Sequence, residues 1–278
     1  MRIHWKRLGT SLLVALGIGV IFVIIAFPLY WMVITSFKPY KEIFQRVPTF
    51  FPKKPVLEHY VSIVQDGLFG YFKNSLIVSV AATAVSVSIG ILAAYSISHF
   101  RYRGRALFSQ LILYVYLFPG AVLFIPLLIV INTLGLTNTL LSLVVAYPVF
   151  GMPFAAWILT GYFSTIPREL EEAARVDGCS RMGALFRVIL PVAMPGIVSA
   201  TIYCFLLSWN ELLYAFTFVT SEAKKTLPMW LSERILGDVF MWGELMAGAI
   251  LMLIPILLIY SLGTKYLVRG LTAGAVKS

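Results

Sequence analysis

Long runs of apolar residues dominate this chain and alternate with shorter polar segments. Six runs are long enough to cross the apolar core of a bilayer, which needs about 20 helical residues. They lie at residues 10–36, 72–98, 106–131, 140–163, 196–219 and 244–267. Because a backbone in lipid must satisfy its own hydrogen bonds, we predict that all six are helices. The predicted fold class is therefore an all-α integral membrane protein with six transmembrane helices.

Details within these runs predict how the helices pack and bend. The first run follows a basic start but is too long for the apolar part of a signal peptide, so we expect a retained first span. Small residues recur every fourth position in the second run, which favours close helix contact; they are Ala82, Ser86, Gly90 and Ala94. Prolines interrupt the third and fourth runs and predict kinks there; they are Pro119, Pro126, Pro148 and Pro153.

Composition agrees with this pattern. Hydrophobic residues make up 60% of the 278 residues and charged residues only 12%, whereas soluble domains contain about a quarter charged residues. The surface must therefore face lipid. The net charge of +10 comes mainly from short segments between apolar runs, which is typical of membrane-protein loops and provides no basic face for nucleic acid.

The basic residues also predict the topology. Lys and Arg are modestly more numerous in the segments that lie inside if the N-terminus is inside, and the short loop Arg101–Arg105 is the strongest local signal. Six spans then place both termini in the cytoplasm. They also place residues 164–195 and the tail at residues 268–278 there.

The sequence lacks the constellations expected of an enzyme. There is no G-x-x-x-x-G-K-[ST] phosphate loop, no HExxH pair and no Ser/His/Asp set. Cys179 and Cys204 lack metal or disulfide spacing, and the three histidines are scattered. We therefore predict a non-catalytic chain with no metal and no cofactor of its own, so that any energy source must lie in another subunit.

The segment from Pro167 to Pro191 predicts two short helices joined by an elbow. Pro167 suits a first helical position, and the glutamates that follow suit the positive end of the helix dipole. Gly178 fits just past the first helix, where a left-handed conformation favours glycine. Ser180 fits as the cap of the second helix, which we expect to run to about Leu190.

This predicted hairpin has a shape and surface that would suit contact with another protein. Ala173 and Ala174 give one face little bulk, while Phe186 and Ile189 supply an apolar face. Such a knob could seat in a groove of another protein. Physical reasoning alone leaves an ordinary surface hairpin equally open.

Three parts of this segment resemble the EAA loop of binding-protein-dependent ABC importer permeases. They are Glu172-Ala-Ala174, Asp177-Gly178 and Ile189-Leu-Pro191, with glycine and proline at the family spacing. The resemblance implies a coupling helix that contacts an ATPase subunit. The residues that it assigns to this contact are Glu171, Glu172, Ala173, Ala174, Asp177, Gly178 and Arg181.

Other segments are similar to the carbohydrate-uptake subfamily, and especially to its smaller, maltose-type permease. They are Ser36-Phe-Lys-Pro39, Asn74-Ser-Leu76, Phe100–Arg105, Ser208-Trp-Asn-Glu211 and Arg269–Ser278. In that relative the tail reaches into the ATPase dimer. The resemblance thus assigns a contact with the ATPase dimer to Arg269, Thr272, Gly274 and Lys277.

The resemblance also implies the fold and the assembly. It implies a type I ABC importer permease in a bacterial inner membrane, paired with a second permease as a heterodimer. Two ATPase subunits would bind ATP and Mg, and an extracellular or periplasmic solute-binding protein would deliver sugar. A non-sugar solute such as glycerol phosphate stays open, as does a secondary transporter, although we see no internal repeat and only one strong intramembrane acid, Glu211.

Trp209, Asn210 and Glu211 lie inside the fifth apolar run and are the candidate substrate-pathway residues. Polar and ionisable groups at such positions are costly and often functional. Sugars stack on aromatic rings and hydrogen-bond to amides and carboxylates. The alternative is that the three residues only make hydrogen bonds between helices.

Overall fold

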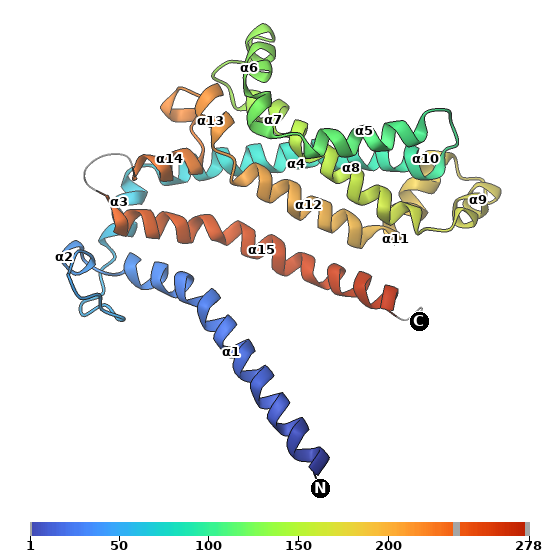
Figure 1. Cartoon of the computed structure of the whole chain (residues 1–278). Helices are drawn as coiled ribbons and strands as arrows, with labels where there is room; N and C mark the ends of the chain where they lie inside the picture. The colour runs from blue at the N-terminus through green and yellow to red at the C-terminus, as the bar shows by residue number, and fades with distance from the viewer. Residues whose placement is uncertain (1, 236–239, 276–278) are drawn as a thin grey trace. The chain divides into compact units, whose positions relative to one another are not determined.

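The computed structural model describes residues 2–235 and 240–275, and every regular element in that part of the chain is helical. The chain divides into two compact units, which we describe separately (Figure 1). Unit 1 comprises residues 1–68 and 231–253, and unit 2 comprises residues 69–230 and 254–278.

Four helical segments in the described residues are long and apolar enough to cross a membrane. They are Leu13–Ser36, Leu68–His99, Leu140–Ser164 and Trp242–Thr264. Two bent pairs, Arg105–Leu117 with Gly120–Thr133 and Arg181–Val192 with Met194–Trp209, raise the number to six if each pair is one span. The helical class is thus as predicted, and the structure supports four to six spans.

Unit 1 contains one long helix and a folded polar loop. In helix α1 (Arg2–Ser36), the apolar side chains between Leu13 and Leu29 are mostly exposed, as expected for a surface in lipid. After it come α2 (Tyr40–Ile43) and α3 (Glu58–Gln65). The second part of unit 1 holds the end of α14 (Leu227–Glu233) and the start of α15 (Trp242–Ala275).

Unit 2 is built around α4 (Leu68–His99), α8 (Pro148–Ser164) and α12 (Met194–Trp209). A buried cluster joins them and includes Tyr95, Leu159 and Phe163. The predicted stripe of small residues allows close approach, since a Cβ added at Gly90 would lie 2.7 Å from that of Ala155. Close backbone packing of this kind needs small side chains.

The third and fourth apolar runs are interrupted at their prolines, but to different extents. In the third run, α5 (Arg105–Leu117) ends before Pro119, and η1 (Gly120–Leu123) with α6 (Phe124–Thr133) continues at 91° to it. In the fourth run, α7 (Leu140–Ala146) passes directly into α8 and the two remain one candidate span. The break at Pro119 is therefore a sharp corner, larger than the predicted kink.

The fifth run, predicted at residues 196–219, is also not one helix. Helix α12 ends at Trp209, and α13 (Leu213–Phe218) begins after a gap of three residues. Figure 1 shows α6 and α13 towards one end of unit 2, while α9 (Arg168–Val176) and α10 (Arg181–Ala184) lie at the other end.

Candidate functional site

The hairpin of α9 and α10 forms as its sequence predicts. Gly178 follows α9 with a φ of 89°, in the left-handed region that favours glycine. The amide of Cys179 closes the elbow by donating to the Ala174 carbonyl over 2.9 Å. Ser180 caps α10, since its hydroxyl oxygen accepts from the Gly183 amide at 3.1 Å. Pro167 is the N-cap of α9, one position earlier than predicted.

The second helix of the hairpin does not stop at Pro191. Helix α10 passes into a π-helical turn, η2 (Leu185–Ile189), and then into α11 (Leu190–Val192). The chain bends by 82° after Val192 and enters α12. The hairpin is therefore directly continuous with a core helix of unit 2.

Apolar side chains of the hairpin divide between the core and the surface. Ile189 is completely buried, whereas Phe186 is 60% exposed, so the two residues do not form the single apolar face that we predicted. Val176 is 87% exposed, and Leu170 and Met182 are also exposed. Ala174 is buried and Ala173 is exposed.

Glu171 turns inward and ties α9 to the end of α4. Its carboxylate accepts a hydrogen bond from the Tyr95 hydroxyl at 2.8 Å, and its other oxygen lies 2.8 Å from His99 Nδ1. The latter contact is an ion pair when the imidazole is protonated. The Arg168 guanidinium adds a bond to the Ser98 carbonyl at 2.9 Å. These contacts hold α9 against the end of α4.

Arg181 also engages its own chain. Its guanidinium lies 4.8 Å above the Phe100 ring, and its carbonyl accepts a 3.4 Å bond from Tyr95. The predicted coupling residues therefore divide into two sets. Glu171 and Arg181 contact other parts of unit 2 and Ala174 is buried, whereas Glu172, Ala173, Asp177 and Gly178 are exposed.

Tyr95 and His99 are the residues that sequence reasoning missed at this site. The three histidines are too scattered in the sequence to suggest a site, so no role is predicted for His99. Its partner Glu171 is distant along the chain, and nothing in the local pattern links the two. One signal was available, since a polar residue at the end of a buried span needs a partner.

The predicted pathway residues do not act as one group. Trp209 is fully buried, and its ring centroid lies 5.5 Å from those of both Phe205 and Phe72. Asn210 is exposed and donates to the Leu206 carbonyl of its own helix at 2.8 Å. The Glu211 carboxylate accepts from the backbone amides of Tyr214 and Ala215, at 3.0 and 3.1 Å.

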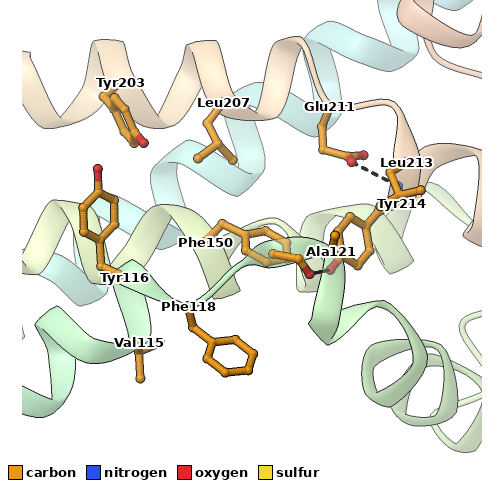
Figure 2. Close-up of a pocket in the computed structure, with 11 residues that line it drawn as sticks. Val115, Tyr116, Phe118, Ala121, Phe150, Tyr203, Leu207, Glu211, Leu213 and Tyr214 are labelled. Atoms are coloured by element: carbon orange, nitrogen blue, oxygen red, sulfur yellow. Dashed lines mark hydrogen bonds between the residues drawn. The ribbon is translucent and has the colours of Figure 1, made fainter.

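Of these three residues, Glu211 alone lines the cavity shown in Figure 2. The cavity has a volume of about 360 Å³. Its other lining residues are Val115, Tyr116, Phe118, Gly120, Ala121, Phe150, Tyr203, Leu207, Leu213 and Tyr214. The aromatic residues come from three different runs, so only the fold brings them together.

The predicted tail contacts add little geometry. The backbone of Arg269, Thr272 and Gly274 continues α15, while Lys277 lies outside the described residues. Within the described residues, no group of three or more His, Cys, Asp or Glu side chains could hold a metal ion.

Comparison with known proteins gives a consistent family match. A model of the family "Binding-protein-dependent transport system inner membrane component" matches residues 86–273. The chain is 39% identical to the inner membrane ABC transporter permease protein YcjP of Escherichia coli (strain K12), over 94% of each chain. It is 36% identical to the diacetylchitobiose uptake system permease protein DasC of Streptomyces coelicolor, over 93% of this chain and 94% of that one.

Two further similarities extend the match to another transport-system permease and to a solved structure. The trehalose/maltose transport system permease protein MalG of Thermococcus litoralis is 34% identical over 96% of each chain. A chain of a bacterial ABC transporter involved in the import of the acidic polysaccharide alginate superposes with a TM-score of 0.79. That superposition covers 92% of this chain and 95% of the other at 22% identity, and it supports the fold.

Proposed function

The chain belongs to the family of inner membrane components of binding-protein-dependent transport systems, and we propose that it is one of two membrane-spanning subunits of an ATP-driven carbohydrate importer. Members of this family are non-catalytic membrane subunits, so hydrolysis of ATP belongs to a partner ATPase. The chain is accordingly a multi-pass protein of the inner membrane. The partners proposed here are a second permease, two ATPases that bind ATP and Mg, and a solute-binding protein.

The α9–α10 hairpin is the proposed coupling element, and its exposed apolar surface carries the proposal. Val176 and Phe186 are 87% and 60% exposed at the end of unit 2 that also holds the glycine elbow. Large apolar side chains beside charged ones are typical of a protein interface. Around these apolar side chains lie exposed charges of both signs, the carboxylates of Glu172 and Asp177 and the guanidinium groups of Arg175 and Arg187.

Transmission from this interface follows from how the hairpin is held. ATP binding draws the ATPase subunits together and moves the hairpin. Because Glu171 is bound to α4 and α11 leads directly into α12, the movement tilts those helices as a body. The pathway then alternates between inward-facing and outward-facing states, which nucleotide and solute populate differently.

Carbohydrate is the proposed cargo because two similar permeases are named for a diacetylchitobiose uptake system and for a trehalose/maltose transport system. Vesicles that carry the complete complex provide the test, with diacetylchitobiose, trehalose, maltose and glycerol 3-phosphate as probes. We expect ATP-dependent uptake of at least one of the three sugars. If only glycerol 3-phosphate were taken up, the cargo would be that phosphate ester and not a carbohydrate. Uptake by this chain without its ATPase would indicate a secondary transporter.

The proposed topology has six spans and two cytoplasmic termini, with each bent helix pair counted as one span. The native cysteines test it without engineering, because Cys179 lies at the hairpin elbow and Cys204 is buried in α12. A membrane-impermeant maleimide should label Cys179 only from the cytoplasmic side. Labelling from the outside of intact spheroplasts would reverse the topology. The tail from Arg269 through Thr272, Gly274 and Lys277 would enter the ATPase dimer from the same side.

Gly178 offers a sharp test of coupling. Gly178→Val places a β-branched residue at positive φ, whereas Gly178→Asn tolerates that conformation much better. Gly135, with a φ of 67° and open space around it, provides a matched control elsewhere in unit 2. We expect Gly178→Val to lose uptake and ATPase stimulation while Gly178→Asn and Gly135→Val retain most of both. Equal loss in Gly135→Val would contradict a coupling role for the hairpin.

A further inference from the structure

Three arginines crowd the short turn that joins α4 to α5, and no acid lies near them in the sequence. They are Arg101, Arg103 and Arg105, and residues 67–168 contain neither Asp nor Glu. The Arg105 guanidinium donates to the Phe100 carbonyl at 3.3 Å. Arg101 and Arg103 are exposed, and within the described residues the side chain of neither forms an ion pair. Because a guanidinium keeps its charge in a protein, this turn attracts anions from outside the chain.

An open pocket of about 540 Å³ adjoins one of these arginines. It is lined by Ser96, Tyr102, Arg103, Gly104 and Phe108. The Ser96 hydroxyl donates to the Tyr102 hydroxyl oxygen at 3.5 Å, which leaves the proton of Tyr102 for another acceptor. Gly104, with a φ of 87° and nothing within 4 Å of an added Cβ, leaves the entrance wide. The pocket thus presents a guanidinium and a hydroxyl as donors, with no carboxylate, and suits an anionic oxygen.

An apolar strip leads from the pocket along α5. Phe108 belongs to the lining, and Leu111 and Val115 follow it at steps of three and four residues, which places all three on one face of the helix. They are 44%, 48% and 50% exposed. The candidate span Leu68–His99 ends just before the turn, and the one that begins at Arg105 starts just after it. The pocket therefore lies where lipid tails give way to headgroups, and the strip runs into the tail region.

We propose that this pocket binds the headgroup of an anionic phospholipid, with phosphatidylglycerol as the probe that tests it. The phosphodiester lies between the Arg103 guanidinium and the Tyr102 hydroxyl, and one acyl chain extends along Phe108 and Leu111. Arginine suits phosphate because its planar donors pair with two oxygens at once. Basic pockets between membrane helices on the cytoplasmic side are suited to such headgroups, and the proposed topology places the turn on that side. The bound lipid holds the corner between α4 and α5 at headgroup depth.

The pocket distinguishes two arginines that orientation in the membrane treats alike. Arg103 lines it, whereas Arg101 is exposed in the same turn and lies outside the lining. Basic residues near the ends of spans orient a membrane protein according to their number. Arg103→Gln and Arg101→Gln remove the same charge from the same turn. A difference between the two variants therefore reports the pocket and not the topology.

The test measures binding of radiolabelled dioleoylphosphatidylglycerol to the complete complex, purified in detergent and immobilised. We expect Arg103→Gln to lower the lipid bound per complex about tenfold, since it removes a charged hydrogen bond to the phosphate. Arg101→Gln should stay within about twofold of the wild type. Equal binding by the two variants would overturn the site.

Competitors identify the source of the phosphate. Unlabelled phosphatidylglycerol should displace the label, whereas the same concentration of dioleoylphosphatidylcholine or inorganic phosphate should not. Displacement by inorganic phosphate would mean that the pocket holds a free anion, and the lipid assignment would fail. Loss of the ATPase from Arg103→Gln with unchanged lipid binding would assign the pocket to a protein contact and would also overturn the proposal. None of these results depends on which solute the complex imports.

A second pair of variants decides the matter if Arg103→Gln does not assemble. Tyr102→Phe removes the hydroxyl that faces the phosphate and keeps the ring. Tyr114, 63% exposed on α5 and outside the lining, provides the matched control Tyr114→Phe. We expect Tyr102→Phe to bind about fivefold less phosphatidylglycerol per complex and the control to bind as much as the wild type. Unchanged binding in Tyr102→Phe would overturn the headgroup assignment.

Discussion

The polar loop at residues 37–57 in unit 1 and the α9–α10 hairpin in unit 2 both bury charged groups and expose apolar side chains, but their buried charges find partners in different places. In the loop, the charged side chains of Lys38 and Glu42 are turned inward and are only 2% and 5% exposed. In the hairpin, Val176 and Phe186 are turned outward and are 87% and 60% exposed. Each arrangement runs against the usual preference for buried apolar and exposed charged groups.

The loop exposes apolar residues as well, among them Val47, Phe50 and Phe51. The difference is that its buried charges have partners within unit 1's own loop, whereas Glu171 of the hairpin has its partners on α4. The Lys38 ammonium donates to the Thr49 carbonyl and lies 4.4 Å above the Trp31 ring. The Glu42 carboxylate accepts from the Thr49 hydroxyl at 2.5 Å and from the Lys53 amide at 3.1 Å. Buried charges with such partners need nothing further. Exposed apolar residues on a polar hairpin gain stability only when a partner covers them.

The largest difference between the two regions is expected when a charge is introduced at an exposed valine in each. Val176→Asp introduces a carboxylate where we propose an apolar contact with the ATPase. Burying an unpaired charge there costs several kcal/mol, so we expect ATPase copurification and uptake to fall about 50-fold or more. Val47, 77% exposed in the loop, is the matched position, and Val47→Asp should leave copurification unchanged. Similar losses in both variants would show that the hairpin is not a special surface.

Adding a side chain at Gly243, beside His59, should lower the stability of the protein without affecting its coupling to the ATPase. A Cβ at Gly243 would lie 2.2 Å from the buried ring of His59, whose Nε2 is 2.7 Å from the Lys38 carbonyl. Overpacking of this kind costs about 1–3 kcal/mol. Gly243→Ala should therefore lower the melting temperature by several degrees, as measured by scanning fluorimetry of the complex. Gly19, with nothing within 4 Å, gives the control Gly19→Ala, which should melt at the wild-type temperature or slightly above.

The two neighbouring glutamates of the hairpin sharpen the comparison within one region. Glu171 contacts Tyr95 and His99, whereas Glu172 is exposed. Removing the charge in Glu171→Gln weakens bonds worth about 1.5 kcal/mol, so hydrogen exchange of the α9 amides should accelerate roughly tenfold. Glu172→Gln should leave that exchange unchanged and affect only ATPase stimulation. Faster exchange in Glu172→Gln than in Glu171→Gln would reverse the two assignments.

Local sequence rules predicted the parts of the molecule that depend on near neighbours. Apolar run length located the long helices, and the Gly178 and Ser180 signals located the elbow and the cap, because these depend on a few adjacent residues. Family resemblance, and not physical chemistry, singled out the hairpin as a coupling element. The same local rules could not distinguish Glu171 from Glu172, since both lie on a short polar helix.

The parts that sequence reasoning missed all depend on distant contacts. Tyr95 and His99 meet Glu171 across the fold, and Tyr116 faces Tyr203 across the cavity of Figure 2. The third and fifth runs were predicted as single helical spans. That prediction rests on the length of the apolar run, which contains no information about a bend such as the 91° corner in the third run. Proline at position 119 predicts a kink, but its angle depends on tertiary bonds such as that from the Tyr214 hydroxyl to the Gly120 carbonyl.

The smallest expected effect is a pH dependence confined to the loop. The Thr49 hydrogen bond is the largest cause that lowers the pKa of Glu42 below its ordinary value of 4.5; the Lys53 amide and the charges of Lys38 and Lys53 act in the same direction, against burial. A carboxyl whose pKa is lower in the folded state stabilises that state at pH values above its unfolded pKa. This stabilisation is lost as pH falls through the lowered value.

Pepsin cleavage can detect this loss, because Phe50 and Phe51 in the loop are exposed aromatic residues. Comparing wild type with Glu42→Gln at each pH cancels the pH dependence of the protease. Near pH 5 the wild-type loop should be cut more slowly than the variant, since only the carboxylate accepts its full set of bonds. The two rates should converge as pH falls through the lowered pKa. Rates that still differed at low pH, where Glu42 and its Gln replacement are both neutral, would mean that ionisation of Glu42 is not what protects the loop.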